Sequence, residues 1–84
     1  MREEIIGTVS DFYAHNDAAG VELTATLELG DHIIIKGHTT DIEMTVNEIQ
    51  IDHADVAKAK AGESVGLKVP DRVRKGDHIF KVSP

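Results

Sequence analysis

The histidines are the residues of this chain that could most readily bind a metal ion or transfer a proton. There are five among the 84 residues, and an imidazole is a common metal ligand that titrates near neutral pH. A zinc site needs about three or four converging ligands, whereas a short pair such as His38 with Asp41 or His53 with Asp55 supplies two. Such pairs are common in loops. We expect no metal site, although a histidine-based metal carrier stays open as an alternative function.

The chain lacks the motifs that hydrolytic enzymes and nucleotide-binding proteins require. The chain has no cysteine, which excludes a thiolate ligand and a cysteine nucleophile. None of the three serines, Ser10, Ser64 and Ser83, stands in a Gly-x-Ser-x-Gly turn. Carboxylate pairs such as Asp52 and Asp55 arise by chance among 15 acidic residues, and no Gly-x-x-x-x-Gly-Lys-Ser/Thr loop is present to bind phosphates. We therefore predict a protein that is not an enzyme, that needs no cofactor and that does not bind GTP.

Acidic and basic residues are segregated along the chain. The formal net charge is −6, yet residues 1–57 carry two basic and 12 acidic side chains, whereas residues 58–84 carry seven basic and three acidic ones. Two interpretations stay open: the basic segment pairs with the acidic strands within the molecule, or it forms a local patch that binds phosphate, since a charge acts within about 8–10 Å. The candidate basic patch consists of Lys68, Arg72, Arg74 and Lys75.

Strands must position these groups, because the apolar residues favour a sheet. Ile and Val total 17 against four Leu, and branching at Cβ costs side-chain freedom in a helix but packs well in a strand. Apolar and polar residues alternate over 21–28 and 42–47, which is typical of half-buried strands. At 33–36 we expect Ile33 and Ile35 to face one way and Ile34 and Lys36 the other. The apolar parity changes between Val46 and Ile49, which predicts a β-bulge or a strand bend.

Turns and one alanine-rich segment separate these strands. Residues 14–20 are small and turn-forming, so we expect a loop there. Residues 54–61 are the only helix candidate and are too short for more than about one or two turns. Gly-Asp-His-Ile occurs at 30–33 and again at 76–79. We interpret this echo as a turn, because Gly adopts a positive φ and Asp can accept a backbone hydrogen bond.

The whole chain, residues 1–84, reads as a single domain without a linker. No apolar run approaches the ~20 residues that span a bilayer, and residues 1–7 lack the apolar region of a signal peptide. The absence of cysteine fits a reducing compartment, so we expect a cytoplasmic location and no membrane partner. About six short strands without a long helix predict an antiparallel barrel or sandwich.

Four segments, taken in order, carry a family resemblance. They are Leu-Glu-Leu-Gly-Asp-His-Ile-Ile-Ile-Lys-Gly at 27–37, Val-Asn-Glu-Ile-Gln-Ile at 46–51, Ala-Gly-Glu-Ser-Val-Gly-Leu at 61–67 and Val-Arg-Lys-Gly-Asp-His-Ile at 73–79. Together they resemble the β-barrel that follows the GTPase domain in translation elongation factors such as elongation factor Tu. The resemblance implies an all-β fold, a closed six-stranded antiparallel Greek-key-like barrel, without room for a GTPase domain. A similar barrel occurs at the C-terminus of some collagenase-like peptidases.

The resemblance also implies a binding site, because the elongation-factor barrel holds the aminoacyl-adenosine end of tRNA. Aligned through Gly62, the family's carboxylate position falls on Gln50, its basic position near His53 and its asparagine on Ser64. The carboxylate has become an amide and the amide a hydroxyl, but all three side chains can form hydrogen bonds. We therefore expect Gln50, His53 and Ser64 to line a ligand edge.

Two functions follow from these expectations. The first is a stand-alone, non-catalytic binding module associated with translation, which contacts RNA (the tRNA acceptor end) or a translation protein through Gln50, Ser64 and the basic turn at 72–75. The alternative is a protein-interaction or assembly module that serves a larger enzyme, such as a collagenase-like peptidase or an RNA-modifying enzyme. In that case Ile34 and Phe80, which we expect to be exposed, belong to an apolar docking surface.

Overall fold

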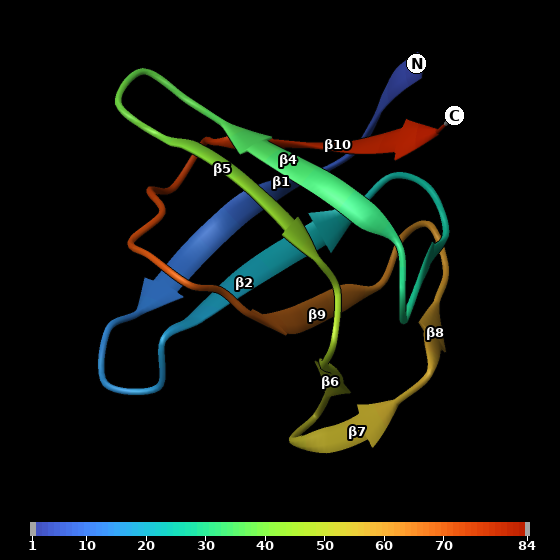
Figure 1. Ribbon diagram of the computed structural model, residues 1–84. Helices are drawn as coiled ribbons and strands as arrows, with labels where there is room; N and C mark the ends of the chain where they lie inside the picture. The colour runs from blue at the N-terminus through green and yellow to red at the C-terminus, as the bar shows by residue number, and fades with distance from the viewer. Residues whose placement is uncertain (1, 84) are drawn as a thin grey trace.

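The computed structural model describes residues 2–83, in which every regular element is a strand (Figure 1). This confirms the all-β prediction. No helix in this range could cross a membrane. The strands are β1 (Arg2–Tyr13), β2 (Ala18–Leu23), β3 (Leu27–Glu28), β4 (His32–Lys36), β5 (Asp41–Thr45), β6 (Ile49–Ile51), β7 (Ala54–Val56), β8 (Lys58–Ala59), β9 (Ser64–Lys68) and β10 (His78–Ser83).

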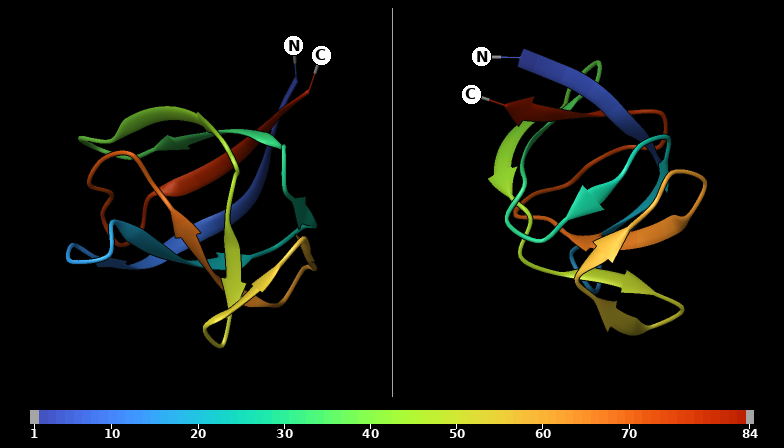
Figure 2. Two further views of the ribbon diagram at one scale, coloured as in Figure 1. Left: turned by 60° about the horizontal axis from the view of Figure 1, so that its bottom comes forward. Right: turned by 90° about the vertical axis from the view of Figure 1, so that its right-hand side faces the viewer.

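Eight of the strands form one antiparallel sheet in the order β5-β4-β10-β1-β2-β9-β6-β7, and β3 pairs with β8 separately. The strand count of six is therefore wrong, because the chain is divided into more and shorter strands than the turn signals indicate. β10, the last strand, lies between β1 and β4 in the middle of the sheet. The sheet curls strongly around its own interior (Figure 2).

The concave face of the sheet holds the core. Its 16 buried apolar residues alternate with outward-facing residues in most strands, as the period of two requires. In β4, for example, Ile33 and Ile35 are fully buried whereas Ile34 is half-buried and Lys36 is exposed. Val21 and Leu23 in β2 follow the same rule. The alternation that the sequence shows in these strands is thus a burial pattern.

Three local predictions are wrong. The helix candidate at 54–61 contains β7 and β8, because Ala59 is buried and pairs with Leu27; tertiary pairing overrides the helix propensity of alanine. The loop predicted at 14–20 ends at Asp17, because β2 begins at Ala18. The parity change between Val46 and Ile49 is not a bulge, since β5 ends at Thr45 and β6 pairs elsewhere, with β7 and β9.

The Gly-Asp echo is confirmed as a turn, and the structure contains it three times. Each copy has a glycine with φ near +90° followed by an acidic residue. The glycine N–H donates to the carbonyl oxygen of a core residue. The N–H of that core residue donates back to the carbonyl oxygen of the acidic residue. The three sets are Gly30, Asp31 and Val46; Gly62, Glu63 and Leu23; and Gly76, Asp77 and Val9. The turns thus attach the chain at three points to the surrounding sheet.

Candidate functional site

A cavity of about 430 Å³ opens on the outer face of β2, β9 and β6. Two glycines form its floor: Gly20 in β2 is the register partner of Gly66 in β9. The row continues to Asp11 beside Gly20 and to Gln50 beside Gly66. Neither glycine has a positive φ, so the backbone conformation does not require them. Their lack of a side chain instead leaves a depression in the sheet surface.

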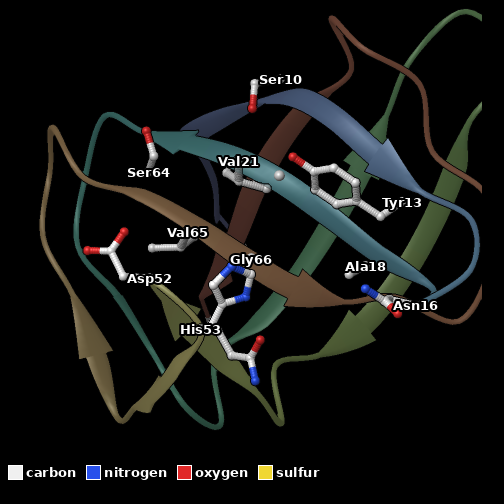
Figure 3. Close-up of a pocket in the computed structure, with 12 residues that line it drawn as sticks. Ser10, Tyr13, Asn16, Ala18, Val21, Asp52, His53, Ser64, Val65 and Gly66 are labelled. Carbon is white, nitrogen blue, oxygen red and sulfur yellow. The ribbon is translucent and has the colours of Figure 1, made fainter.

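The β1–β2 turn and the β6–β7 turn form the walls of the cavity. Tyr13 and Asn16 come from the end of β1 and the turn that follows it, and Asp52 and His53 form the turn between β6 and β7. Figure 3 shows the Tyr13 ring and the His53 ring reaching toward the cavity from these two connections. Asp52 and His53 both have positive φ, 51° and 66°, as the two central residues of a type I′ hairpin require.

The structure brings Gln50, His53 and Ser64 together on this cavity. Gln50 and His53 come from the β6–β7 hairpin and Ser64 from β9, and that all three bind a ligand stays a prediction. The Gln50 amide is fixed, because its Nε2 donates to Asp55 Oδ1 at 3.1 Å. That bond leaves the amide oxygen of Gln50 as an acceptor for a bound molecule.

The residues of the candidate basic patch do not line the cavity. Lys68 Nζ donates to the carbonyl oxygen of Asn16 at 3.0 Å, and the Arg72 guanidinium lies 6.0 Å from the centroid of the Phe12 ring. Arg74 and Lys75 are exposed at the turn before β10. Lys68 and Arg72 therefore have partners within the molecule, and nothing in these contacts gathers the four cations on one ligand.

Sequence reasoning missed Tyr13, Asn16 and Asp52 as cavity residues. The available signal was a pair of glycines, Gly20 and Gly66, at outward-facing positions of two strands, where a missing side chain indicates a close approach of another group. That the β1–β2 turn meets the β6–β7 turn depends on the order of strands in the sheet. No local pattern specifies that order.

A second surface feature is an apolar row across β1, β10 and β4. Ile5, Phe80 and Ile34 are successive register partners, which we call the apolar row. Ile5 is 48 % exposed. Ile34 and Phe80 are half-buried and not exposed as expected.

An ion pair covers part of the apolar row. Lys36 Nζ lies 5.4 Å from the centroid of the Phe80 ring and 2.8 Å from Glu3 Oε1. The hydrogen bond that the Lys36 ammonium donates to the Glu3 carboxylate raises the pKa of Lys36 above its usual value. The ammonium therefore stays charged over the ring, where a cation is attracted to the aromatic face.

The comparisons with known proteins point to one kind of enzyme. No family model matches the chain. It is 45 % identical over 76 residues, 89 % of its length, to an uncharacterised protease of Methanocaldococcus jannaschii, of which it covers 19 %. It is 28 % identical over 78 residues to a collagenase of Porphyromonas gingivalis, covering 90 % of this chain and 22 % of the collagenase. The similarity is to peptidases. The chain spans about a fifth of the length of these relatives.

The solved structures agree on the fold. The C-terminal domain of a Geobacillus thermoleovorans protein described as a U32 peptidase superposes with a TM-score of 0.88 at 17 % identity, covering 95 % of this chain and 93 % of that domain. Its selenomethionine variant gives a TM-score of 0.86. At this identity the likeness shows the fold and not the function.

The expectation that this chain is related to the elongation-factor barrel is therefore wrong. The relatives are peptidases, and a translation role, an RNA partner and a translation-protein partner are overturned with it. The physical reason lies in the motifs themselves. The Gly-Asp and Gly-Glu segments that carried the resemblance are turns that hold the sheet together, and a turn that serves the fold says nothing about the ligand.

Proposed function

We propose that this chain is a non-catalytic accessory module of a peptidase similar to its relatives. The observation that carries the proposal is the 45 % identity over 89 % of this chain and only 19 % of the Methanocaldococcus protease. A segment of that size corresponds to one domain of a larger enzyme, and the superposed Geobacillus domain is likewise one part of its protein. The module would act by holding a catalytic domain or its substrate.

Support for a docking role comes from the apolar row. Arg2 is the register partner of Ser83, so β1 and β10 bring both ends of the described chain to one corner (Figure 1). Ile5 and Phe80 pair on the same two strands, only a few residues from that corner. A catalytic domain joined at either end would therefore lie next to the apolar row, and burial of Ile5 against it would be favourable.

Support for a non-catalytic role comes from the cavity. Among residues 2–83 no group of three or more His, Cys, Asp and Glu side chains could hold a metal ion. Ser64, His53 and Asp52 all line the cavity, but no hydrogen bond joins any two of them in the described part of the chain. A serine nucleophile requires its base within hydrogen-bonding reach. We therefore assign peptide cleavage to the catalytic domain and not to this module.

Association with a catalytic domain tests the proposal. The Methanocaldococcus protease, produced without its matching 76 residues, is mixed with this chain, and the complex is followed by sedimentation velocity. We expect a complex, and we expect Ile5→Lys to abolish or strongly weaken it, because a charge in the centre of a buried contact is left without a partner. The chain alone should not cleave denatured casein.

Leu29→Lys is the matched control. Leu29 is 44 % exposed, much like Ile5, but lies in a turn outside the apolar row. This variant should bind the truncated protease as well as the unchanged chain does. No complex with the unchanged chain, or equal losses in the two variants, would contradict the proposed docking surface.

We also propose that the curled sheet closes into a barrel, with the turn before β4 as the closing piece. The Gly30 N–H donates to the Val46 carbonyl oxygen and the Val46 N–H to the Asp31 carbonyl oxygen, both at 2.8 Å. On the other side of this turn the Leu29 N–H donates to the Ala57 carbonyl oxygen at 3.0 Å. These bonds support closure, because they span the gap between the edge strands β5 and β7. A cytoplasmic location stays a prediction from the cysteine-free composition.

A further inference from the structure

The apolar row is continued by a carboxylate. Ile34, its last member, is the register partner of Glu43 in β5, and register partners project from the same face of a sheet. β5 is the edge strand beside β4 (Figure 1). Ile5 and Glu43 therefore mark the two ends of one line across four strands, about 14 Å apart at the usual strand spacing. One partner surface of ordinary size can cover both.

The Glu43 carboxylate can accept a further hydrogen bond from a partner. Its side chain is 64 % exposed. Oε2 lies 2.6 Å from Nε2 of His32, and no lysine or arginine of residues 2–83 forms an ion pair with Glu43. A cation placed against Oε1 would therefore form a charge-assisted hydrogen bond without displacing a resident lysine or arginine.

The single lysine beside the apolar row does not offset the charge of Glu43. The Lys36 ammonium lies 2.8 Å from the Glu3 carboxylate, and its register partner Asp41 is a second, exposed carboxylate. One ammonium thus faces two carboxylates, and Glu43 adds a third on the same face. Negative charge exceeds positive charge around the apolar row, which attracts a basic surface and repels an acidic one.

The same charges disfavour a second copy of this chain as the partner. In a two-fold symmetric contact the same face of both copies meets itself. Asp41 and Glu43 of one copy would then approach an equally acidic face, and like charges brought together in an interface are destabilising. The charge pattern therefore favours a different, basic surface over self-association.

We propose that the surface of the catalytic domain that binds the apolar row is basic beside its apolar contact, with a lysine or an arginine placed against Glu43. The proposal rests on the accessory role proposed above and adds the chemistry of the partner. Ile5 supplies the apolar contact, which contributes most of the affinity. Glu43 supplies a charged contact at the other end of the line, which fixes the orientation of the module on the enzyme.

Charge reversal at two exposed positions tests the proposal. Binding to the truncated Methanocaldococcus protease is measured by sedimentation velocity for Glu43→Lys and Glu48→Lys. Glu48 is exposed in the connection between β5 and β6, away from the apolar row, so this control makes the same change in net charge. We expect a loss of affinity of about tenfold or more in Glu43→Lys and of less than about twofold in Glu48→Lys. Equal effects would refute the assignment of Glu43.

Thr45 permits a change in the opposite direction. It is exposed and lies two residues from Glu43, on the same face of β5. Thr45→Glu should tighten the complex and Thr45→Lys should weaken it, because a basic partner surface attracts the first side chain and repels the second. A variant that binds more tightly cannot be explained by damage to the fold. Equal affinities of the two variants would contradict a basic partner surface.

Salt dependence completes the test and separates it from that of the accessory role. We expect tighter binding of the unchanged chain at about 50 mM than at about 500 mM NaCl, since salt screens exposed charges. A complex that is lost in Ile5→Lys but is unaffected by salt and by Glu43→Lys would overturn the basic partner surface and leave apolar docking intact. No complex with the unchanged chain at either salt concentration would overturn both proposals.

Discussion

At the scale of single residues, Gly30, Gly62 and Gly76 decide how the chain turns. Their φ values are 89°, 91° and 95°, and a Cβ added at any of them would meet no atom within 4 Å. A substitution there would thus cost free energy through the backbone conformation alone and not through crowding. A left-handed conformation costs an L-residue about 1–2 kcal/mol, whereas removing a glycine restricts the unfolded chain and returns about 0.4–1 kcal/mol.

Gly62→Ala should therefore destabilise the fold by about 1 kcal/mol, as a lower urea midpoint with an unchanged slope. Gly66→Ala is the matched control. Its φ is not positive, and its Cβ would lie 4.0 Å from the Gln50 Cβ, an ordinary contact. The control should be neutral or slightly stabilising. Equal losses in the two variants would show that glycine is needed for another reason than φ.

The sequence predicted two of these three turns. The third, at Gly62, was not recognised because its residue types differ. Asp31 and Asp77 each accept a backbone N–H with Oδ2, from Glu28 and Arg74 respectively. The two turns therefore share residue types and can be found as a repeat. In the third turn Glu63 occupies the acidic position and only the backbone bonds are common to all. A pattern of residue types does not reveal a repeat made by the main chain.

At the scale of elements, the β6–β7 hairpin combines strain with a place in the cavity. Asp52 and His53 are its two loop residues, since Ile51 pairs with Ala54. Both have positive φ, and the favoured sequence for such a turn is Asn-Gly. A histidine at the second position, φ 66°, is therefore unfavourable for the hairpin. Its side chain lines the cavity.

His53→Gly should stabilise the protein by about 1 kcal/mol, because glycine adopts positive φ without strain. In a domain of this size that change raises the melting temperature by about 4–8 °C. His38→Gly serves as the control, since His38 is exposed and its φ is not positive. It should lower the melting temperature. A fall in both variants would mean that His53 makes contacts worth more than the strain of its turn.

The elements that the sequence predicted correctly are those fixed by alternation, such as β4 with buried Ile33 and Ile35. The helix prediction for 54–61 was wrong because its alanines favour a helix locally. In the structure Ala59 is buried and pairs with Leu27 of β3, which lies 32 residues earlier in the chain.

Only part of the cavity lining could be predicted from the sequence. Gln50, His53 and Ser64 came from a resemblance, whereas Tyr13 reaches them only through the strand order.

At the scale of the whole molecule, the segregated charges partly neutralise each other. Lys58 lies 3.8 Å from Glu28, and Lys81 lies 3.4 Å from Asp31, so two cations of the basic segment 58–84 face carboxylates of the acidic segment. The Lys58–Glu28 pair is exposed and contributes little to stability, about 0–1 kcal/mol, whereas the Lys81–Asp31 pair is partly buried. Their consequence is electrostatic, because these carboxylates offset part of the positive charge of the basic segment.

The first and the last strand of the described chain are both needed for the fold, because they pair with each other. β10, the last strand, pairs with β1, the first, and also with β4, and its Ile79 is fully buried. Loss of β10 would leave two strands with unpaired edges in the middle of the sheet and a void in the core. We expect a chain that ends at Asp77 to be unfolded, with no cooperative transition in urea by circular dichroism.

A circular permutant separates the need for β10 from the need for a free end. A short glycine-rich linker joins the paired ends near Arg2 and Ser83, and new ends are opened between His38 and Thr39, which are exposed in the β4–β5 loop. Every strand of the sheet is kept, so we expect cooperative unfolding and an unchanged all-β spectrum. The linker also covers the corner beside the apolar row. The permutant should therefore bind the truncated protease less well than the unchanged chain. Equal binding of the protease by a folded permutant and by the unchanged chain would contradict a docking surface beside the paired ends.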